Sequence, residues 1–254
     1  MKRSIDYGPV ADLYDSYVAV TSDIPFFIAE ASKSGGPVLE LMSGTGRISL
    51  PLMEAGIPLT CVDYSREMLA RLRAKLASRS QPLRVVMADV RALPFARRFA
   101  LAILPFNSFG EIIDREGQLA ALRSIRASLS EGGVFVCTLH NPHLRLRSVD
   151  GEMRTLAHSR HPSGTGELVL RAQLSFDEPT RVVSGVQVLE ERAANGALLG
   201  ERRMRIQFAL PSREELEERA RSAGFVIDSL FGDYDRSSYE EQTSPYMIWR
   251  LSAA

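Results

Sequence analysis

The feature that most constrains this fold is a regular alternation of short apolar runs with helical segments. The apolar runs, each of the length of a buried strand, are residues 38–42, 59–62, 83–87, 100–104 and 134–139. The segments 47–55, 65–78 and 118–129 lie between them and carry apolar residues at helical spacing. This order is typical of strand–helix–strand units. It predicts an α/β fold with a doubly wound parallel sheet, whose ligands bind at the carboxyl ends of the strands.

The remaining segments predict an N-terminal helical part and an antiparallel part. Residues 6–31 read as helical, with Pro25 in the first turn of a second helix. Residues 141–166 read as irregular, whereas 167–176, 181–192 and 198–210 alternate polar and apolar residues, with Asn195-Gly196 as a hairpin turn. A capping box at Ser212 and Glu215 predicts a helix that ends at Gly224, and two closing strands follow at 225–231 and 246–251.

These segments predict three parts of the chain. Residues 1–36 form a helical arm or lid. Residues 37–140 and 211–254 form one α/β domain with a mostly parallel, seven-stranded sheet, and 141–210 form a loop and an inserted antiparallel β-sheet that covers the ligand site. The edge of this insertion is a candidate surface for pairing in a homodimer.

Charge and composition exclude several classes of protein. The chain has 31 Lys+Arg and 31 Asp+Glu, and this zero net charge argues against a nucleic-acid partner. Apolar runs fall short of the ~20 residues that cross a membrane, and no signal-peptide pattern follows the N-terminus. Cys61 and Cys137 lie in apolar runs, which favours a cytoplasmic protein with reduced thiols. The four histidines lack acidic or cysteine partners at ligand spacing, so no metal site is predicted.

The strongest local signal is the segment 38–47, VLELMSGTGR, in which a strand with an acid leads through a Gly-x-Gly turn into a helix. Glycines let the backbone approach a ligand there, and the helix start offers unpaired N–H groups. A dinucleotide fingerprint needs a third glycine, but position 49 is Ser49. A purely structural strand–helix turn is the alternative interpretation.

Two further acids, Asp63 and Asp89, follow the next two strands. A carboxylate at a strand end can accept hydrogen bonds from the vicinal hydroxyls of a ribose. Each acid alone is also explained as a helix N-cap. Together with Glu40 they place three acids in register at one edge of the sheet, which caps alone explain poorly, so the pattern predicts a nucleoside site.

These motifs resemble those of the class I S-adenosylmethionine-dependent methyltransferases, over about residues 14–251. Segment 39–47 is similar to the family's first motif, 62–69 to the second, and 88–90 with 93–95 to the third. Tyr14-Asp15 resembles the arm that closes over the cofactor. Two positions depart from the pattern, because Met42 replaces the first glycine and Ala100 stands where Phe-Asp usually begins the fourth strand.

The resemblance implies a Rossmann-like methyltransferase fold that uses S-adenosylmethionine and releases S-adenosylhomocysteine. It implies that Gly44 and Gly46 line the methionine part, that Glu40 orients this turn or the cofactor's amino group, and that Asp63 holds the ribose. Tyr64 and Met68 would flank the adenine, with Asp89 near its amine. The implied cofactor-binding residues are Tyr14, Glu40, Met42, Gly44, Thr45, Gly46, Asp63, Tyr64, Met68, Ala88, Asp89, Val90, Leu104, Pro105 and Phe106.

The segment after the fourth strand, residues 104–109 (LPFNSF), lacks the Asn/Asp-Pro-Pro-Tyr motif of base-modifying members. It is similar to small-molecule members, including glycine/sarcosine and amino-sugar N-methyltransferases. The resemblance implies methyl transfer to a small molecule, N-methylation favoured over O-methylation, by an in-line displacement that depends mainly on alignment.

The candidate catalytic residues are His140, as a general base, and Asn107, which would position the acceptor. For His140 a structural role, hydrogen-bonded to a loop carbonyl, is the alternative. The arginines at 145, 147, 154 and 160 are either solvated or form a basic lid for an anionic acceptor. Two other functions stay open at this point: a nicotinamide-dependent oxidoreductase, which Ser49 and Asp89 disfavour, and a non-catalytic adenosyl-cofactor-binding protein.

Overall fold

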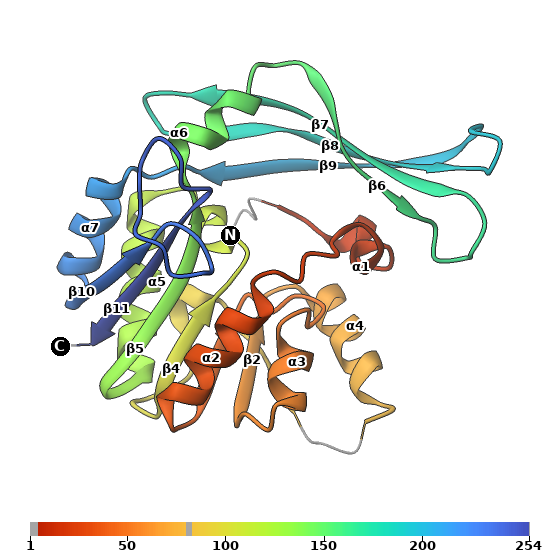
Figure 1. Cartoon of the computed structure of the whole chain (residues 1–254). Coiled ribbons are helices and arrows are strands. Elements are labelled where there is room, and N and C mark those ends of the chain that lie inside the picture. The colour runs from red at the N-terminus through yellow and green to blue at the C-terminus, as the bar shows by residue number, and fades with distance from the viewer. Residues whose placement is uncertain (1–4, 80–82, 254) are drawn as a thin grey trace.

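The computed structural model describes residues 5–79 and 83–253, which form two β-sheets (Figure 1). The larger sheet has seven strands in the order β10-β11-β5-β4-β1-β2-β3. They are β1 (Val38–Leu41), β2 (Leu59–Asp63), β3 (Arg84–Met87), β4 (Phe99–Leu104), β5 (Leu129–His140), β10 (Phe225–Phe231) and β11 (Tyr246–Ala253). Strands β1 to β5 are parallel, while β11 is antiparallel to β5 and to β10. The expected doubly wound, mostly parallel sheet is confirmed.

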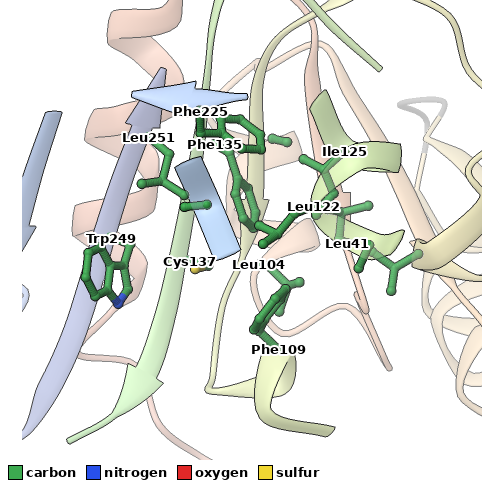
Figure 2. Close-up of a cluster of buried hydrophobic side chains, with 14 of the residues drawn as sticks. Leu41, Leu104, Phe109, Leu122, Ile125, Phe135, Cys137, Phe225, Trp249 and Leu251 are labelled. Carbon is green, nitrogen blue, oxygen red and sulfur yellow. The ribbon is translucent and has the colours of Figure 1, made fainter. Parts of the chain in front are cut away.

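Helices cover both faces of this sheet, because its central strands are apolar on both sides. The helices are α2 (Ile24–Ser34), α3 (Ser49–Glu54), α4 (Arg66–Leu76), α5 (Arg115–Ser128) and α7 (Arg213–Ser222). Helices α5 and α7 pack on one face around Leu122, Phe135 and Trp249 (Figure 2). Helices α2, α3 and α4 pack on the other face, around Phe27 and Leu69.

The second sheet has four antiparallel strands in sequence order and lies across the carboxyl ends of the parallel strands (Figure 1). Its strands are β6 (Met153–Arg160), β7 (Glu167–Asp177), β8 (Val182–Arg192) and β9 (Leu198–Ala209). The short helices α1 (Tyr14–Tyr17) and α6 (Pro142–Arg145) lie beside it. A third apolar cluster, which includes Val10, Leu13, Leu170 and Ile206, joins this sheet to the N-terminal arm. The arm is therefore fixed between the two sheets.

The structure corrects three expectations about the elements. Residues 6–31 do not form continuous helix: a 3₁₀ turn at Gly8–Val10, α1 and α2 are separated by non-helical segments, and Pro25 lies in the first turn of α2 as expected. Strand β5 begins at Leu129, five residues before the start of the strand expected over 134–139, so it follows α5 without a loop. Segment 141–166 contains strand β6, which the sequence does not reveal because its side chains are mostly exposed and lack an apolar alternation.

The capping box of α7 is confirmed, since the Ser212 hydroxyl accepts from the backbone of Glu215 and the Glu215 side chain accepts from the backbone of Ser212. The hairpin turn at Asn195-Gly196 is confirmed as well. No helix in the described part of the chain is long and apolar enough to cross a membrane.

Candidate functional site

A pocket lies at the carboxyl ends of β1, β2 and β3, between the N-terminal arm and the segment that follows β4. This is the edge of the sheet at which the strand-end acids are expected. Nine of the residues expected at a cofactor line it: Tyr14, Met42, Gly44, Asp63, Tyr64, Met68, Ala88, Asp89 and Val90. The other six do not line the pocket: Glu40, Thr45, Gly46, Leu104, Pro105 and Phe106.

Asp63 fixes the shape of the pocket. Its Oδ2 accepts a hydrogen bond from the backbone N–H of Gly44 at 2.7 Å, and its Oδ1 accepts one from the backbone N–H of Ser65 at 2.7 Å. One carboxylate thereby joins the turn after β1 to the start of α4. A carboxylate can accept more than two hydrogen bonds, so Asp63 is also suited to accept from the hydroxyl groups of a ligand.

The two glycines of the turn do different work. Gly44 (φ 57°) lines the pocket, and a Cβ there would lie at ordinary contact distance, 3.5 Å from the Met68 methyl. Gly46 (φ 89°) faces α4, where a Cβ would come within 2.4 Å of Leu72 Cδ1. Gly44 therefore leaves room at the ligand, while Gly46 permits close packing of the turn on a helix.

Met42 occupies the position at which the family pattern has a glycine. Its backbone has φ 52°, a left-handed conformation that favours glycine. Its side chain lines the pocket and packs against the large core cluster. Met42, the residue that departs from the family pattern, therefore lies at the ligand site.

Glu40 lies behind the turn and outside the pocket lining. It is 2% exposed, and Cys61 Sγ donates to its Oε2 at 3.6 Å. Burial raises the pKa of Glu40 to about 7. The structure therefore fits a role in supporting the turn better than a direct contact with a cofactor's amino group.

Asp89 does line the pocket, at the end of β3. Arg91 donates to both of its oxygens through its guanidinium, and the backbone N–H of Arg91 donates to Oδ1 at 2.9 Å. Burial opposes ionisation, but these hydrogen bonds outweigh it and hold the pKa of Asp89 below its ordinary value. Asp89 is thus an ionised, preoriented acceptor at the pocket wall.

The N-terminal arm is pinned to the turn by polar contacts. Thr45 Oγ1 donates to Asp15 Oδ1 at 2.6 Å, and Lys75 Nζ pairs with Asp15 Oδ2 at 2.7 Å. Arg47 donates two hydrogen bonds of 2.6 Å to the buried carboxylate of Asp23, and its guanidinium lies 4.8 Å from the centre of the Phe106 ring. Thr45 and Phe106 therefore secure the arm, which explains why neither lines the pocket.

Replacing Arg47 with lysine is expected to destabilise the protein by about 1–2 kcal/mol, because lysine keeps the charge but cannot form the two-pronged contact with Asp23. Differential scanning calorimetry measures the loss. Limited proteolysis should show faster cleavage within residues 18–23. Arg97→Lys, at an exposed arginine, is the matched control. An equal melting temperature for the two variants would contradict this role of the ion pair.

Residues not anticipated from the sequence complete the pocket. Tyr7 and Glu111 line it, and the Tyr7 hydroxyl donates to Glu111 Oε1 at 3.0 Å. Burial raises the pKa of Glu111 to about 8. One signal was available: Glu111 interrupts an otherwise apolar run directly after the LPFNSF segment. The contact with Tyr7 spans more than a hundred residues, so spacing along the chain could not reveal it.

The two expected catalytic residues lie beside the pocket and do not line it. Asn107 follows Phe106, and both have positive φ (63° and 59°), which marks a strained turn after β4. The buried Oδ1 of Asn107 has no hydrogen-bond partner in the part of the chain that the structure describes. Such an oxygen is available to a ligand.

His140 ends β5, and its ring centre lies 5.9 Å from that of Phe208 in β9. Burial, together with the positive charge of Arg145, lowers the pKa of His140 to about 3. The imidazole is therefore neutral at physiological pH and a weak base.

Three of the four arginines considered for a basic lid contact other side chains. Arg145 stacks on Phe208 at 5.3 Å, Arg147 contacts His143, and Arg154 pairs with Asp150. Among the described residues no group of three or more His, Cys, Asp or Glu is arranged to hold a metal ion.

Comparison with known proteins identifies the class. Residues 38–133 match the protein family described as a methyltransferase domain. The chain is 27% identical to the cypemycin N-terminal methyltransferase of a Streptomyces species, over 84% of this chain and 82% of that protein. It is 32% identical to the glycine/sarcosine N-methyltransferase of Halorhodospira halochloris, over 51% of this chain and 50% of that protein.

Solved structures share the whole fold. The CcbJ methyltransferase from Streptomyces caelestis superposes with a TM-score of 0.85 at 23% identity, covering 100% of both chains. DesVI from Streptomyces venezuelae superposes with a TM-score of 0.72 at 18% identity, covering 98% of this chain and 99% of that one. Residues 38–133 are therefore a methyltransferase domain, and the chain as a whole has the fold of these solved methyltransferases. The oxidoreductase interpretation is thereby set aside.

Proposed function

We propose that this enzyme transfers a methyl group from S-adenosylmethionine to a nitrogen atom of a small-molecule acceptor. The observation that carries the proposal is the pocket in which Asp63 joins the Gly44 turn to α4, together with a buried amide oxygen on Asn107 that has no hydrogen-bond partner among the described residues. The names of its relatives support the nitrogen acceptor, because the cypemycin and glycine/sarcosine proteins are both described as N-methyltransferases.

The residues of the pocket fit an adenosyl ligand. The carboxylates of Asp63 and Asp89 are acceptors suited to ribose hydroxyls and to the adenine amine. Met42, Met68 and Val90 supply apolar walls for the base, and Gly44 leaves backbone close to the ligand. In this proposal Tyr14 and Tyr64 complete the walls, whereas Glu40, Thr45, Gly46 and Phe106 support the site from behind.

When bound, S-adenosylmethionine supplies an electrophilic methyl group, and the protein's task is to align the acceptor and exclude water. The N-terminal arm and the segment 141–210 are suited to this task because they cover the strand ends. The Oδ1 of Asn107, in the turn after β4, is buried and without a partner among the described residues, and in this proposal it orients an acceptor by accepting a hydrogen bond from it.

The nitrogen preference also has a chemical reason. A hydroxyl acceptor needs a base to remove its proton, whereas a neutral amine attacks with its own lone pair. His140 was the expected base, but a pKa of about 3 makes it a poor one. We assign it instead a positioning role as a neutral ring beside Phe208.

Incubation with S-adenosylmethionine and matched acceptor pairs tests the proposal. The two members of each pair share one skeleton, which carries an amino group in one and a hydroxyl group in the other. The amino members are amino sugars, glycine and sarcosine, and short peptides with a free amino terminus. Formation of S-adenosylhomocysteine, followed by mass spectrometry, should run at least about tenfold faster with the amino member. Turnover of hydroxyl members alone would contradict the nitrogen assignment.

Binding is tested separately from turnover. S-adenosylhomocysteine at about a hundred times its dissociation constant should stabilise the protein by about 2.7 kcal/mol, which raises the melting temperature by roughly 5–10 °C. Absence of a shift with this ligand and with S-adenosylmethionine would contradict the proposed function.

A further inference from the structure

The pocket carries more acidic than basic side chains. Its described lining includes the four carboxylates of Asp63, Asp89, Glu111 and Asp114 but a single cation, Arg91. Arg91 is already engaged, since it forms an ion pair of 2.7 Å with Asp89. Arg91 also acts on the charge of Asp114, whereas no described cation of the lining acts on the charge of Glu111.

Asp63 and Asp114 are compensated by backbone dipoles. Asp63 accepts from two backbone N–H groups, those of Gly44 and Ser65. Asp114 caps α5, where its Oδ1 accepts from the backbone N–H of Gly117 at 2.7 Å. Amide hydrogens and the positive end of a helix stabilise a carboxylate in place of a counter-ion.

Glu111 has neither kind of compensation among the described residues. Its carboxyl accepts a hydrogen bond from the neutral phenol of Tyr7, and the other groups that act on its charge are Tyr14, beside Tyr7, and the like charge of Asp63. Arg91 and Asp89 face the same pocket as a closed pair, and β9 contributes the uncharged Gln207. A buried carboxyl in this setting is costly to ionise until a cation enters.

We propose that Glu111 is the counter-ion for the sulfonium of S-adenosylmethionine and that it lets the protein distinguish this cofactor from S-adenosylhomocysteine. This rests on the proposed function in placing the cofactor in the pocket. The two molecules share the adenosine and amino-acid groups and differ by one methyl group and one positive charge. Differential binding that separates them must therefore act on the methyl group or on the charge, and Glu111 supplies the matching negative charge.

The proton balance follows from the same contact. The sulfonium favours the carboxylate form, so Glu111 releases a proton to solvent when S-adenosylmethionine binds. The neutral thioether of S-adenosylhomocysteine does not favour that form, so its binding releases none. Loss of the sulfur's charge on methyl transfer leaves Glu111 uncompensated again, which weakens the hold on the by-product relative to the cofactor.

Isothermal titration calorimetry of the whole chain tests this at about pH 7.5, in phosphate and in Tris, whose ionisation enthalpies differ. The wild-type protein should release roughly half a proton to one proton with S-adenosylmethionine and none with S-adenosylhomocysteine. Glu111→Gln should lose this release and bind S-adenosylmethionine about tenfold more weakly, with unchanged affinity for S-adenosylhomocysteine.

Asp114→Asn is the matched control, because it removes a charge from the same pocket and keeps an oxygen that can cap α5. The ratio of its affinities for S-adenosylmethionine and S-adenosylhomocysteine should stay within about threefold of the wild-type ratio. Equal proton release with both ligands in the wild type would overturn the proposal. This measurement on the wild type does not depend on whether Glu111→Gln folds. An unchanged ratio in folded Glu111→Gln would overturn it too. Failure of both ligands to bind the wild type would instead overturn the proposed function.

Discussion

Replacing Asp63 with alanine is expected to weaken S-adenosylmethionine binding by at least about a hundredfold, which corresponds to about 3 kcal/mol. The variant loses the acceptor proposed for the ribose. It also leaves the N–H groups of Gly44 and Ser65 without the carboxylate to which both donate at 2.7 Å. The turn after β1 then loses its link to α4, so the loss combines a missing contact with a less ordered pocket.

Calorimetric titration of the variant with S-adenosylmethionine measures this effect. The affinity of Asp63→Asn for S-adenosylmethionine should lie between those of the wild type and Asp63→Ala, because one amide oxygen can replace only one of the carboxylate's two acceptor oxygens. Asp177→Ala, at an exposed acid at the end of β7 far along the chain from the pocket, is the control and should bind as the wild type does. Asp63→Ala with wild-type affinity and an intact melting temperature would remove Asp63 from the binding site.

The second large effect separates the two glycines of the turn. Gly46→Ala should lower stability by about 3 kcal/mol, because the new Cβ would lie 2.4 Å from Leu72 Cδ1 at a backbone φ of 89°. For a chain of this size, that lowers the melting temperature by roughly 6–12 °C. The cause is a steric conflict between the turn and α4 and does not depend on a ligand.

Gly44→Ala is the matched variant, and it should weaken ligand binding while it lowers stability only a little. At φ 57° alanine costs only about 1 kcal/mol, and its Cβ would meet Met68 at ordinary contact distance. Because Gly44 lines the pocket, S-adenosylmethionine affinity should fall by about tenfold while the fold persists. Thermal unfolding of the ligand-free proteins, followed by titration, distinguishes the two. Equal loss of stability in both variants would contradict the division of roles.

Much of the architecture is predictable from local patterns. The apolar runs and helical segments of residues 38–140 give the parallel sheet because a strand buried on both faces has to be continuously apolar. Strand β6 was not predicted for a related reason. Strand β6 is mostly exposed, so its residues carry no apolar alternation, and its place in the sheet comes from pairing with β7.

Most of the pocket residues that were predicted lie at strand ends or in the turns that follow them, while Tyr14 and Met68 lie in helices. Asp63 and Asp89 lie where the pattern places them, because strand ends of a parallel sheet meet at one edge. Thr45, Gly46 and Phe106 lie in the same motifs, yet they face the arm or α4. A spacing rule names a loop but does not determine which way each of its side chains points.

The sequence by itself therefore determined the fold class and the edge of the sheet at which Asp63 and Asp89 meet, since these depend on periodicity and on where strands end, and the resemblance of its motifs to a known family indicated the type of reaction. The tertiary structure alone decided the rest. It brought Tyr7 to Glu111 and Phe208 to His140 across long separations in the chain. Burial at those contacts then set which of the two side chains can exchange a proton near neutral pH, because the cost of a buried charge depends on neighbours that are distant in sequence.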